Sequence, residues 1–308
     1  MGLLSKWIES LDYQYEISSY CTRYVSPHST CGQCVNSCEM KAIELVNGKP
    51  VINHKNCNEC GNCISDCPVQ AIAGIYPKRT IIQNELVVQS QKIPTVKELL
   101  ILYKKGVKTI VGEKSSLIEW WKEPIDEAND LLKQLNEAPF SISVKSIEEE
   151  RYFSRRELFS LWKNESKSAM KQAAPAKWRF NQNDLHLPKY YRDYQFARIT
   201  INSEKCMLCT ACQKLCQNKC LNITEGHFSL LSQGCSSCQL CVDICPEKAI
   251  IVENQIAKAE ETLLPIYQKV CTVCQKTYST LREHDEKCVA CRKQESFKKS
   301  KEGNHYAF

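Results

Sequence analysis

The chain has 308 residues, of which 43% are hydrophobic, and its 41 Lys and Arg exceed its 35 Asp and Glu to give a formal net charge of +6. It contains 21 cysteines, no apolar run of membrane length and no signal peptide that we recognise, which argues against a small secreted disulfide scaffold. We therefore expect a cytoplasmic protein whose reduced thiols bind metal.

The N-terminal segment, residues 1–76, carries eight cysteines, of which seven form two runs separated by eighteen residues. The first run is Cys31, Cys34 and Cys38, and the second is Cys57, Cys60, Cys63 and Cys67, followed by Pro68. Between the runs, residues 44–46 and 51–52 favour two short strands. Asn47-Gly48 lies between them and is typical of a tight hairpin turn.

The next segment, residues 77–150, has no cysteine and alternates strand and helix patterns. Strands are expected at residues 85–88, 107–111 and 140–144. Helical patterns run from Thr95, an N-cap residue, to Gly106, and then from residue 116 to residue 135, where Pro124 marks a break or a fresh start. This order predicts a parallel sheet with right-handed crossovers, covered by helices.

Residues 89–94, which follow the first of these strands, contain no glycine, so they do not form the glycine-rich loop that a nucleotide site requires. We interpret residues 77–150 as a small α/β (βαβαβ) module for docking or spacing. A plain structural insert explains the pattern equally well.

Residues 151–195 are basic and aromatic. Between residues 151 and 180, eight Lys or Arg face Glu157 and Glu165 alone, a local balance of +6. Ser154-Arg155-Arg156 looks like part of an export signal, but the string is internal and no apolar run follows it. We expect an amphipathic helix and a linker whose positive charge attracts an acidic partner, rather than a nucleic-acid site.

A second, more regular cysteine set occupies residues 196–260. It consists of two C-x2-C-x2-C-x3-C runs, again eighteen residues apart, and Pro246 follows the second. The two runs are Cys206, Cys209, Cys212 and Cys216, and then Cys235, Cys238, Cys241 and Cys245. Strands are expected at residues 199–201, 222–224 and 228–231.

The C-terminal segment, residues 261–308, contains two C-x2-C knuckles separated by thirteen residues. They are formed by Cys271 with Cys274 and by Cys288 with Cys291. Four thiolates from two knuckles suit a closed structural zinc site, so we expect one zinc ion in a zinc-ribbon-like tail. A mononuclear iron and an unmetallated tail are the alternatives. Neither knuckle contains a glycine that would let amides crowd the sulfurs, which favours zinc over iron.

The spacing of the two larger cysteine sets resembles that of the bacterial ferredoxins that bind two [4Fe–4S] clusters. The resemblance covers residues 21–76 and 199–252, about a third of the chain. It implies an α+β fold with two ferredoxin-like dicluster units, separated by the α/β module. In this family the fourth cysteine of one run ligates the cluster held by the other run.

The resemblance implies four cluster sites, which we name by residue. The first is Cys31, Cys34, Cys67 and one further ligand. The second is Cys57, Cys60, Cys63 and Cys38; the third is Cys206, Cys209, Cys212 and Cys245; the fourth is Cys235, Cys238, Cys241 and Cys216.

The first site lacks its expected cysteine, because position 28 is His28. Cys21, seven residues upstream, is our preferred replacement, since it is otherwise without a role and thiolate is the usual ligand. The alternatives are ligation by His28, a three-iron cluster and an empty site.

Cys220 remains outside all of these sets. A small residue stands four positions after the last cysteine of each run. These residues are Ala42, Ala71, Cys220 and Ala249. We therefore interpret Cys220 as a buried substitute for alanine, next to an apolar residue that helps to exclude water from the cluster.

A cluster with four thiolate ligands has no vacant iron and can only gain or lose electrons. We therefore expect a non-enzymatic electron carrier, or the electron-transfer subunit of an oxidoreductase, with an oxidoreductase partner that presents an acidic docking surface. An iron–sulfur redox or oxygen sensor is the alternative.

Overall fold

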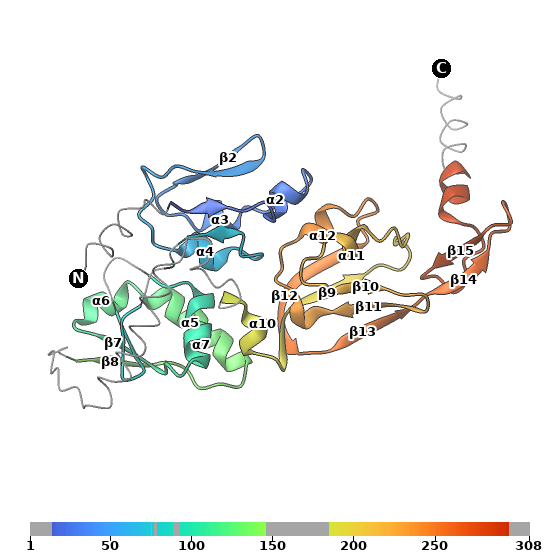
Figure 1. The fold of residues 1–308 in the computed structure, drawn as a ribbon. Coiled ribbons are helices and arrows are strands. Elements are labelled where there is room, and N and C mark those ends of the chain that lie inside the picture. The colour runs from blue at the N-terminus through green and yellow to red at the C-terminus, as the bar shows by residue number, and fades with distance from the viewer. Residues whose placement is uncertain (1–13, 75, 77–78, 89–92, 146–184, 296–308) are drawn as a thin grey trace, which may run out of the picture. The chain divides into compact units, whose positions relative to one another are not determined.

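The computed structural model describes residues 14–74, 76, 79–88, 93–145 and 185–295. These residues belong to two compact units, one formed by residues 1–27 and 31–192 and the other by residues 28–30 and 193–308. Each unit is a mixture of short helices and small sheets (Figure 1). Among the described helices, none combines the length and the apolar character needed to cross a bilayer.

The cysteine-rich part of the first unit is built from two antiparallel strand pairs. Strand β1 (Glu16–Ile17) pairs with β4 (Ile72–Ala73), and β2 (Ile43–Val46) pairs with β3 (Lys49–Ile52). The β2–β3 hairpin has the turn that its sequence predicts, because Asn47 and Gly48 both have positive φ angles, of 51° and 76°. Its short helices are α2 (Thr22–Val25), α3 (Gln33–Asn36) and α4 (Asn62–Asp66).

The rest of the first unit contains a four-stranded sheet in the order β5-β6-β7-β8. Its strands are β5 (Ile81–Ile82), β6 (Glu85–Val87), β7 (Thr109–Gly112) and β8 (Ser141–Val144). The three strands expected from the sequence are β6, β7 and β8, and they pair in parallel. Strand β5 was not expected and adds an antiparallel edge.

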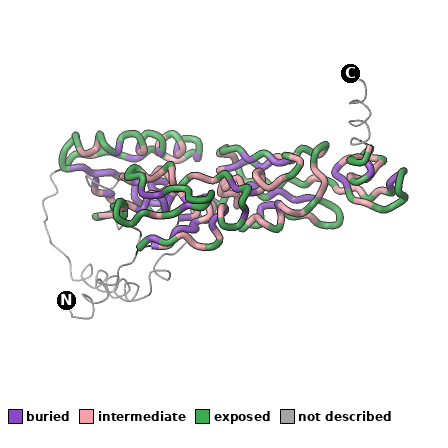
Figure 2. The backbone as a smooth tube through the Cα atoms, turned by 90° about the horizontal axis from the view of Figure 1, so that it is seen from above, coloured by how far each residue is buried: buried purple, intermediate pink, exposed green. Residues whose placement is uncertain are grey.

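Helices α5 (Val96–Lys104), α6 (Ser115–Glu119) and α7 (Lys122–Gln134) connect the parallel strands. The Thr95 hydroxyl accepts a hydrogen bond from the Glu98 amide, as an N-cap should, and Gly106 has the positive φ of 103° that suits the end of a helix. The helices and strands β6 and β7 contribute buried apolar side chains to a core, including Leu86, Leu99, Ile110, Ile125 and Leu132. Figure 2 colours the backbone of the described residues by burial.

The segment 151–195 was expected to contain a basic helix. Residues 146–184 lie outside the described residues, so that expectation stays a prediction. Helix α10 (Leu187–Tyr190) belongs to the first unit, where the Tyr191 hydroxyl donates a hydrogen bond to the Leu100 carbonyl over 2.8 Å.

The second unit repeats the strand arrangement of the first cysteine-rich part. Its outer strands β9 (Tyr194–Ile201) and β12 (Ile250–Lys258) pair antiparallel, and its inner strands β10 (Leu221–Ile223) and β11 (His227–Leu231) form a hairpin. Strand β13 (Glu261–Pro265) extends the hairpin into a three-stranded sheet. The expected strands are present, although β9 begins five residues earlier than position 199.

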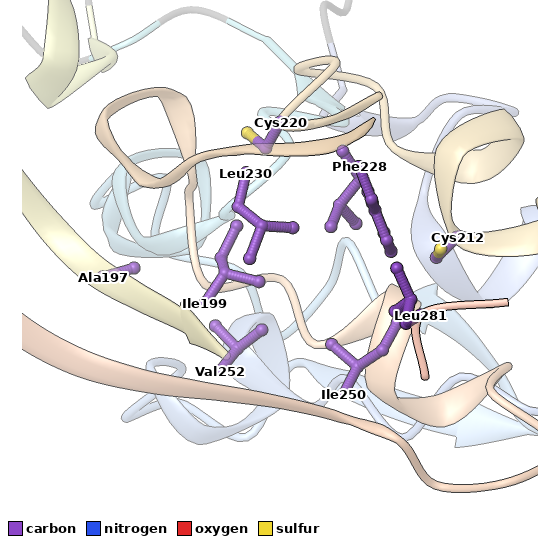
Figure 3. Close-up of a cluster of buried hydrophobic side chains, with 10 residues drawn as sticks. Ala197, Ile199, Cys212, Cys220, Phe228, Leu230, Ile250, Val252 and Leu281 are labelled. Carbon is purple, nitrogen blue, oxygen red and sulfur yellow. The ribbon is translucent and has the colours of Figure 1, made fainter. Parts of the chain in front are cut away.

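Short helical segments connect these strands. They are α11 (Ala211–Leu215), the 3-10 turn η2 (Ser232–Gly234) and α12 (Leu240–Asp243). Between the outer pair and the hairpin lies a buried core that includes Ile199, Phe228, Leu230 and Ile250 (Figure 3). The chain then forms a separate hairpin from β14 (Tyr267–Val270) and β15 (Thr277–Thr280), followed by helical residues 289–295.

Candidate metal centres

The last cysteine of each run lies at the start of the same backbone turn. In all four turns, the residue four positions later donates its backbone N–H to the cysteine sulfur. The pairs are Ala42 with Cys38 (3.2 Å), Ala71 with Cys67 (3.1 Å), Cys220 with Cys216 (3.3 Å) and Ala249 with Cys245 (3.2 Å). An N–H that points at sulfur stabilises the thiolate form and is one of the contacts that tune an iron–sulfur cluster.

A left-handed residue just before the donor makes this turn possible. The four residues are Lys41, Gln70, Lys219 and Lys248, with φ angles between 47° and 53°. The donors themselves are buried, with exposed fractions of 0%, 0%, 2% and 1% for Ala42, Ala71, Cys220 and Ala249. The expectation that Cys220 occupies a buried alanine position is thus confirmed.

Cys220 also has a role that the sequence did not predict. Its thiol donates a hydrogen bond to the Asn218 carbonyl over 3.8 Å, and its side chain is the main cause that lowers the pKa of Cys216 to about 6. The Cys220 side chain also lowers the pKa of Cys235. Cys220 therefore influences two sulfurs that the spacing assigns to the fourth site.

Three of the four cysteine loops share a second backbone feature. The residues immediately before and after the middle cysteine both have positive φ angles. These pairs are Glu59 and Gly61 around Cys60, Leu208 and Thr210 around Cys209, and Ser237 and Gln239 around Cys238. Because a left-handed conformation costs a non-glycine residue about 1–2 kcal/mol, five such residues in equivalent places indicate loops shaped around a bound group.

The loop of Cys31 and Cys34 is different. Gly32, which corresponds to Gly61 in position, has a φ of −132°. This is also the loop in which His28 replaces the expected cysteine. The irregular spacing in the sequence is therefore matched by an irregular backbone.

The third site is a cavity. Cys206, Cys209 and Cys212 line it together with Cys245, and its apolar wall includes Phe228 and Ile250. This is the set of four thiols that the ferredoxin resemblance implies, and it brings together residues 33 positions apart. The donor set, the apolar wall and the N–H bond to Cys245 all suit an iron–sulfur cluster.

For the second and fourth sites, the causes that shift the pKa of the third cysteine in each set show which thiols lie near it. Burial is the main cause that raises the pKa of Cys63, and the thiols of Cys60, Cys57, Cys34 and Cys38 raise it further. Burial likewise raises the pKa of Cys241, with added contributions from Cys238, Cys235, Cys216 and Cys212. Each of these cysteines thus lies near its predicted partners and also near one cysteine of the neighbouring set.

In the first site, Cys21 lies near the three cysteines of the predicted set. Burial raises the pKa of Cys34 to about 12, followed by the thiols of Cys67, Cys21 and Cys31. Cys21 is 9% exposed and belongs to a small buried cluster with Cys67 and Ala71.

The pairing of β1 with β4 explains why Cys21 lies near Cys67. Beyond the pair, the Ser18 amide donates to the Ala71 carbonyl over 2.8 Å, and the Tyr20 hydroxyl donates to the Gln70 carbonyl over 3.2 Å. These bonds hold the residues just before Cys21 against those just after Cys67. The Arg23 side chain then ties α2 to the neighbouring loop by donating to the Cys31 carbonyl.

The C-terminal cysteines form a more compact group. The sulfurs of Cys271, Cys274, Cys288 and Cys291 all lie within 4.8 Å of one another, and those of Cys274 and Cys288 are 3.8 Å apart. Sulfurs bound tetrahedrally to one zinc ion at about 2.3 Å would be about 3.8 Å apart. Among the described residues, no other cysteine, histidine or carboxylate group is as closely gathered.

Backbone amides also approach this group. The Cys288 amide donates to the Cys271 sulfur over 3.4 Å, and the amides of Cys274 and Cys288 are the leading causes that lower the pKa of Cys271 to about 6. Amides therefore reach the sulfur without glycines in the knuckles. The missing glycines, which the sequence argument used against mononuclear iron, do not distinguish the two metals.

Comparison with known protein families gives a match over part of the chain. Residues 29–71 match a protein-family model described as a 4Fe-4S dicluster domain. The matched segment contains the seven cysteines from Cys31 to Cys67, and it does not extend to the second cysteine set. No curated protein matches the chain. The chain therefore carries an iron–sulfur dicluster domain at residues 29–71 and a separate four-cysteine group at residues 271–291.

Proposed function

We propose that this chain is an electron-transfer protein that carries up to four [4Fe–4S] clusters. Two ferredoxin-like units, at residues 1–76 and 196–260, would each hold two clusters, and the tail at residues 261–308 would hold one zinc ion. The observation that carries the proposal is the turn that recurs four times, with an N–H aimed at the last cysteine sulfur of each run.

The ligand sets follow from the crossed pattern of the runs. Cys21 with Cys31, Cys34 and Cys67 holds the first cluster, and Cys57, Cys60, Cys63 and Cys38 hold the second. Cys206, Cys209, Cys212 and Cys245 hold the third, and Cys235, Cys238, Cys241 and Cys216 hold the fourth. The burial of Cys21 beside Cys67 supports its place in the first set.

When bound, such a cluster supplies reversible one-electron chemistry. Four cysteines for each cluster would supply every iron with a thiolate ligand, so that no position would remain for a substrate. The buried residues Ala42, Ala71, Cys220 and Ala249 exclude water on one side of each site and donate N–H to its sulfurs, which offsets the negative charge of the thiolates. This design suits electron exchange without bond-making.

The excess of positive charge suits an oxidoreductase partner with an acidic docking surface, because opposite charges raise the rate of encounter. The α/β module offers a surface for that docking. A reducing compartment such as the cytoplasm would keep the ligand thiols available for metal.

Metal content and electron paramagnetic resonance (EPR) of anaerobically purified protein test this proposal. We expect about sixteen iron atoms, as many sulfides and one zinc per chain, with [4Fe–4S] EPR signals after reduction. A Cys21→Ser variant should lose up to four irons, whereas His28→Ala, the matched control, should keep them all. A colourless protein without sulfide would contradict the proposal, and full iron in Cys21→Ser would contradict the choice of Cys21.

A further inference from the structure

The C-terminal hairpin contributes to the core of the second unit. Leu281 follows β15 directly and is only 6% exposed. It belongs to the buried cluster of Cys212, Phe228 and Ile250, and Figure 3 shows it beside Phe228 and Ile250. Those three residues also line the cavity of the third site. Leu281 therefore packs against the wall of that cavity.

The next residue, Arg282, makes polar contacts next to the third site. Its guanidinium pairs with Glu204, two residues before Cys206, at 4.0 Å, and with Asp285 at 3.6 Å. This pair places the Arg282 guanidinium next to the segment that carries Cys206.

A second arginine also contacts Asp285. The Asp285 carboxylate, whose side chain is 7% exposed, also pairs with Arg292 at 3.4 Å and accepts a hydrogen bond from the Thr280 hydroxyl over 3.0 Å. We call residues 280–285 the corner. The corner lies between the two cysteine knuckles in the sequence. Its position therefore depends on these contacts and on the four-cysteine group.

The hairpin has almost no apolar core of its own. Between residues 266 and 295, the buried residues are Cys271, Thr280, Leu281 and Cys291. Two of them are the proposed metal ligands and two belong to the corner. A segment this small depends on its metal for folding, so that losing the metal should release the corner.

We propose that metal binding by Cys271, Cys274, Cys288 and Cys291 holds the corner against the third site and thereby protects the cluster bound there. This inference rests on the proposed function, since it assumes a cluster on Cys206, Cys209, Cys212 and Cys245. The C-terminal metal would keep Leu281 packed against the cavity wall and Arg282 near Cys206.

The first test removes the metal. Full-length Cys288→Ser and wild-type protein are purified anaerobically, their zinc and iron are measured, and the loss of visible absorbance is followed after mixing with air-saturated buffer. We expect Cys288→Ser to lose its zinc, to keep its iron while anaerobic, and to bleach several-fold faster with the amplitude of one cluster. Val273→Ala, a change at a 55% exposed residue of the same knuckle, is the control and should behave as wild type.

A second test keeps the metal and alters the corner. Leu281→Ala should retain zinc and bleach faster by the amplitude of one cluster, because water and oxygen gain access to the wall. Arg282→Gln should retain zinc and lower the reduction potential of one cluster in an EPR-monitored titration, because a nearby positive charge stabilises the reduced, more negative form.

The outcomes separate this inference from the proposed function. Unchanged bleaching in both Cys288→Ser and Leu281→Ala, with zinc absent from the first and present in the second, would overturn the inference and leave the electron-transfer proposal intact. Wild-type protein that binds zinc but no iron would instead overturn the proposed function.

Discussion

Arg79 and Glu98 form a buried ion pair with two parallel hydrogen bonds, from Nε to Oε1 at 2.8 Å and from Nη2 to Oε2 at 2.6 Å. Both side chains are only 4% exposed, and the Arg79 guanidinium lies 6.0 Å from the centre of the Trp121 ring. The pair joins the segment that enters the α/β sheet to the first turn of α5. The pair therefore connects the segment after the cysteine runs to helix α5 of the α/β module.

Replacing Glu98 with glutamine should destabilise the first unit by about 3–5 kcal/mol, because the change leaves a buried arginine without its counter-charge. Thermal unfolding of the cluster-loaded protein, followed by circular dichroism, measures the loss. Glu85→Gln removes the partner of the Glu85–Lys145 pair, whose side chains are 31% and 56% exposed, and should cost about 1 kcal/mol or less. Equal effects of the two changes would show that the Arg79–Glu98 pair is not structurally important.

Lys97 places a positive charge near the first site. Its Nζ donates to the Ser65 carbonyl over 2.9 Å, two residues before Cys67. Burial is the main cause that lowers the pKa of Lys97 to about 8, and Cys67 and Asp66 counteract it, so the group is mostly protonated at pH 7. Lys97→Met should lower the reduction potential of one cluster, because the reduced form loses a stabilising charge.

An EPR-monitored redox titration of Lys97→Met at pH 7 checks this expectation. Lys133→Met, which removes an exposed lysine near the end of α7, serves as the matched control and should leave all potentials as they are in the wild type. A titration in which the two variants coincide would disprove a tuning role for Lys97.

Replacing Cys220 with alanine separates its two roles. As a substitute for alanine it is dispensable, so Cys220→Ala should keep the full iron content. Its side chain also lowers the pKa of Cys216 and Cys235, which stabilises their thiolate forms, so its loss should lower the potential of the cluster that they would bind. Loss of four irons from Cys220→Ala would instead make Cys220 a ligand.

The small residue after each run should resist enlargement. Ala249 is 1% exposed, and its N–H bonds the Cys245 sulfur over 3.2 Å. Ala249→Leu should overpack this turn, at a cost of about 1–3 kcal/mol, and reduce the iron content by one cluster. Ile251→Leu, a change at a residue that is 53% exposed two positions later, should be neutral in both the iron assay and thermal unfolding.

Sequence reasoning succeeded where structure is local. The turn at Asn47-Gly48, the cap at Thr95 and the parallel strands β6, β7 and β8 all follow from residue type and periodicity. Strand β5 was missed because its turn is formed by Gln83 and Asn84, both with positive φ, and glutamine does not usually signal such a turn.

The cysteine spacing by itself determined the kind of chemistry, because two or three residues between thiols set which sulfurs a single loop can present. It also predicted the buried small residue after each run. Only the tertiary structure decided which distant groups meet. Cys21 approaches Cys67 because β1 pairs with β4, and Leu281 reaches Phe228 because a separate hairpin folds back onto the core. Such contacts depend on chain closure over many residues, which no local pattern encodes.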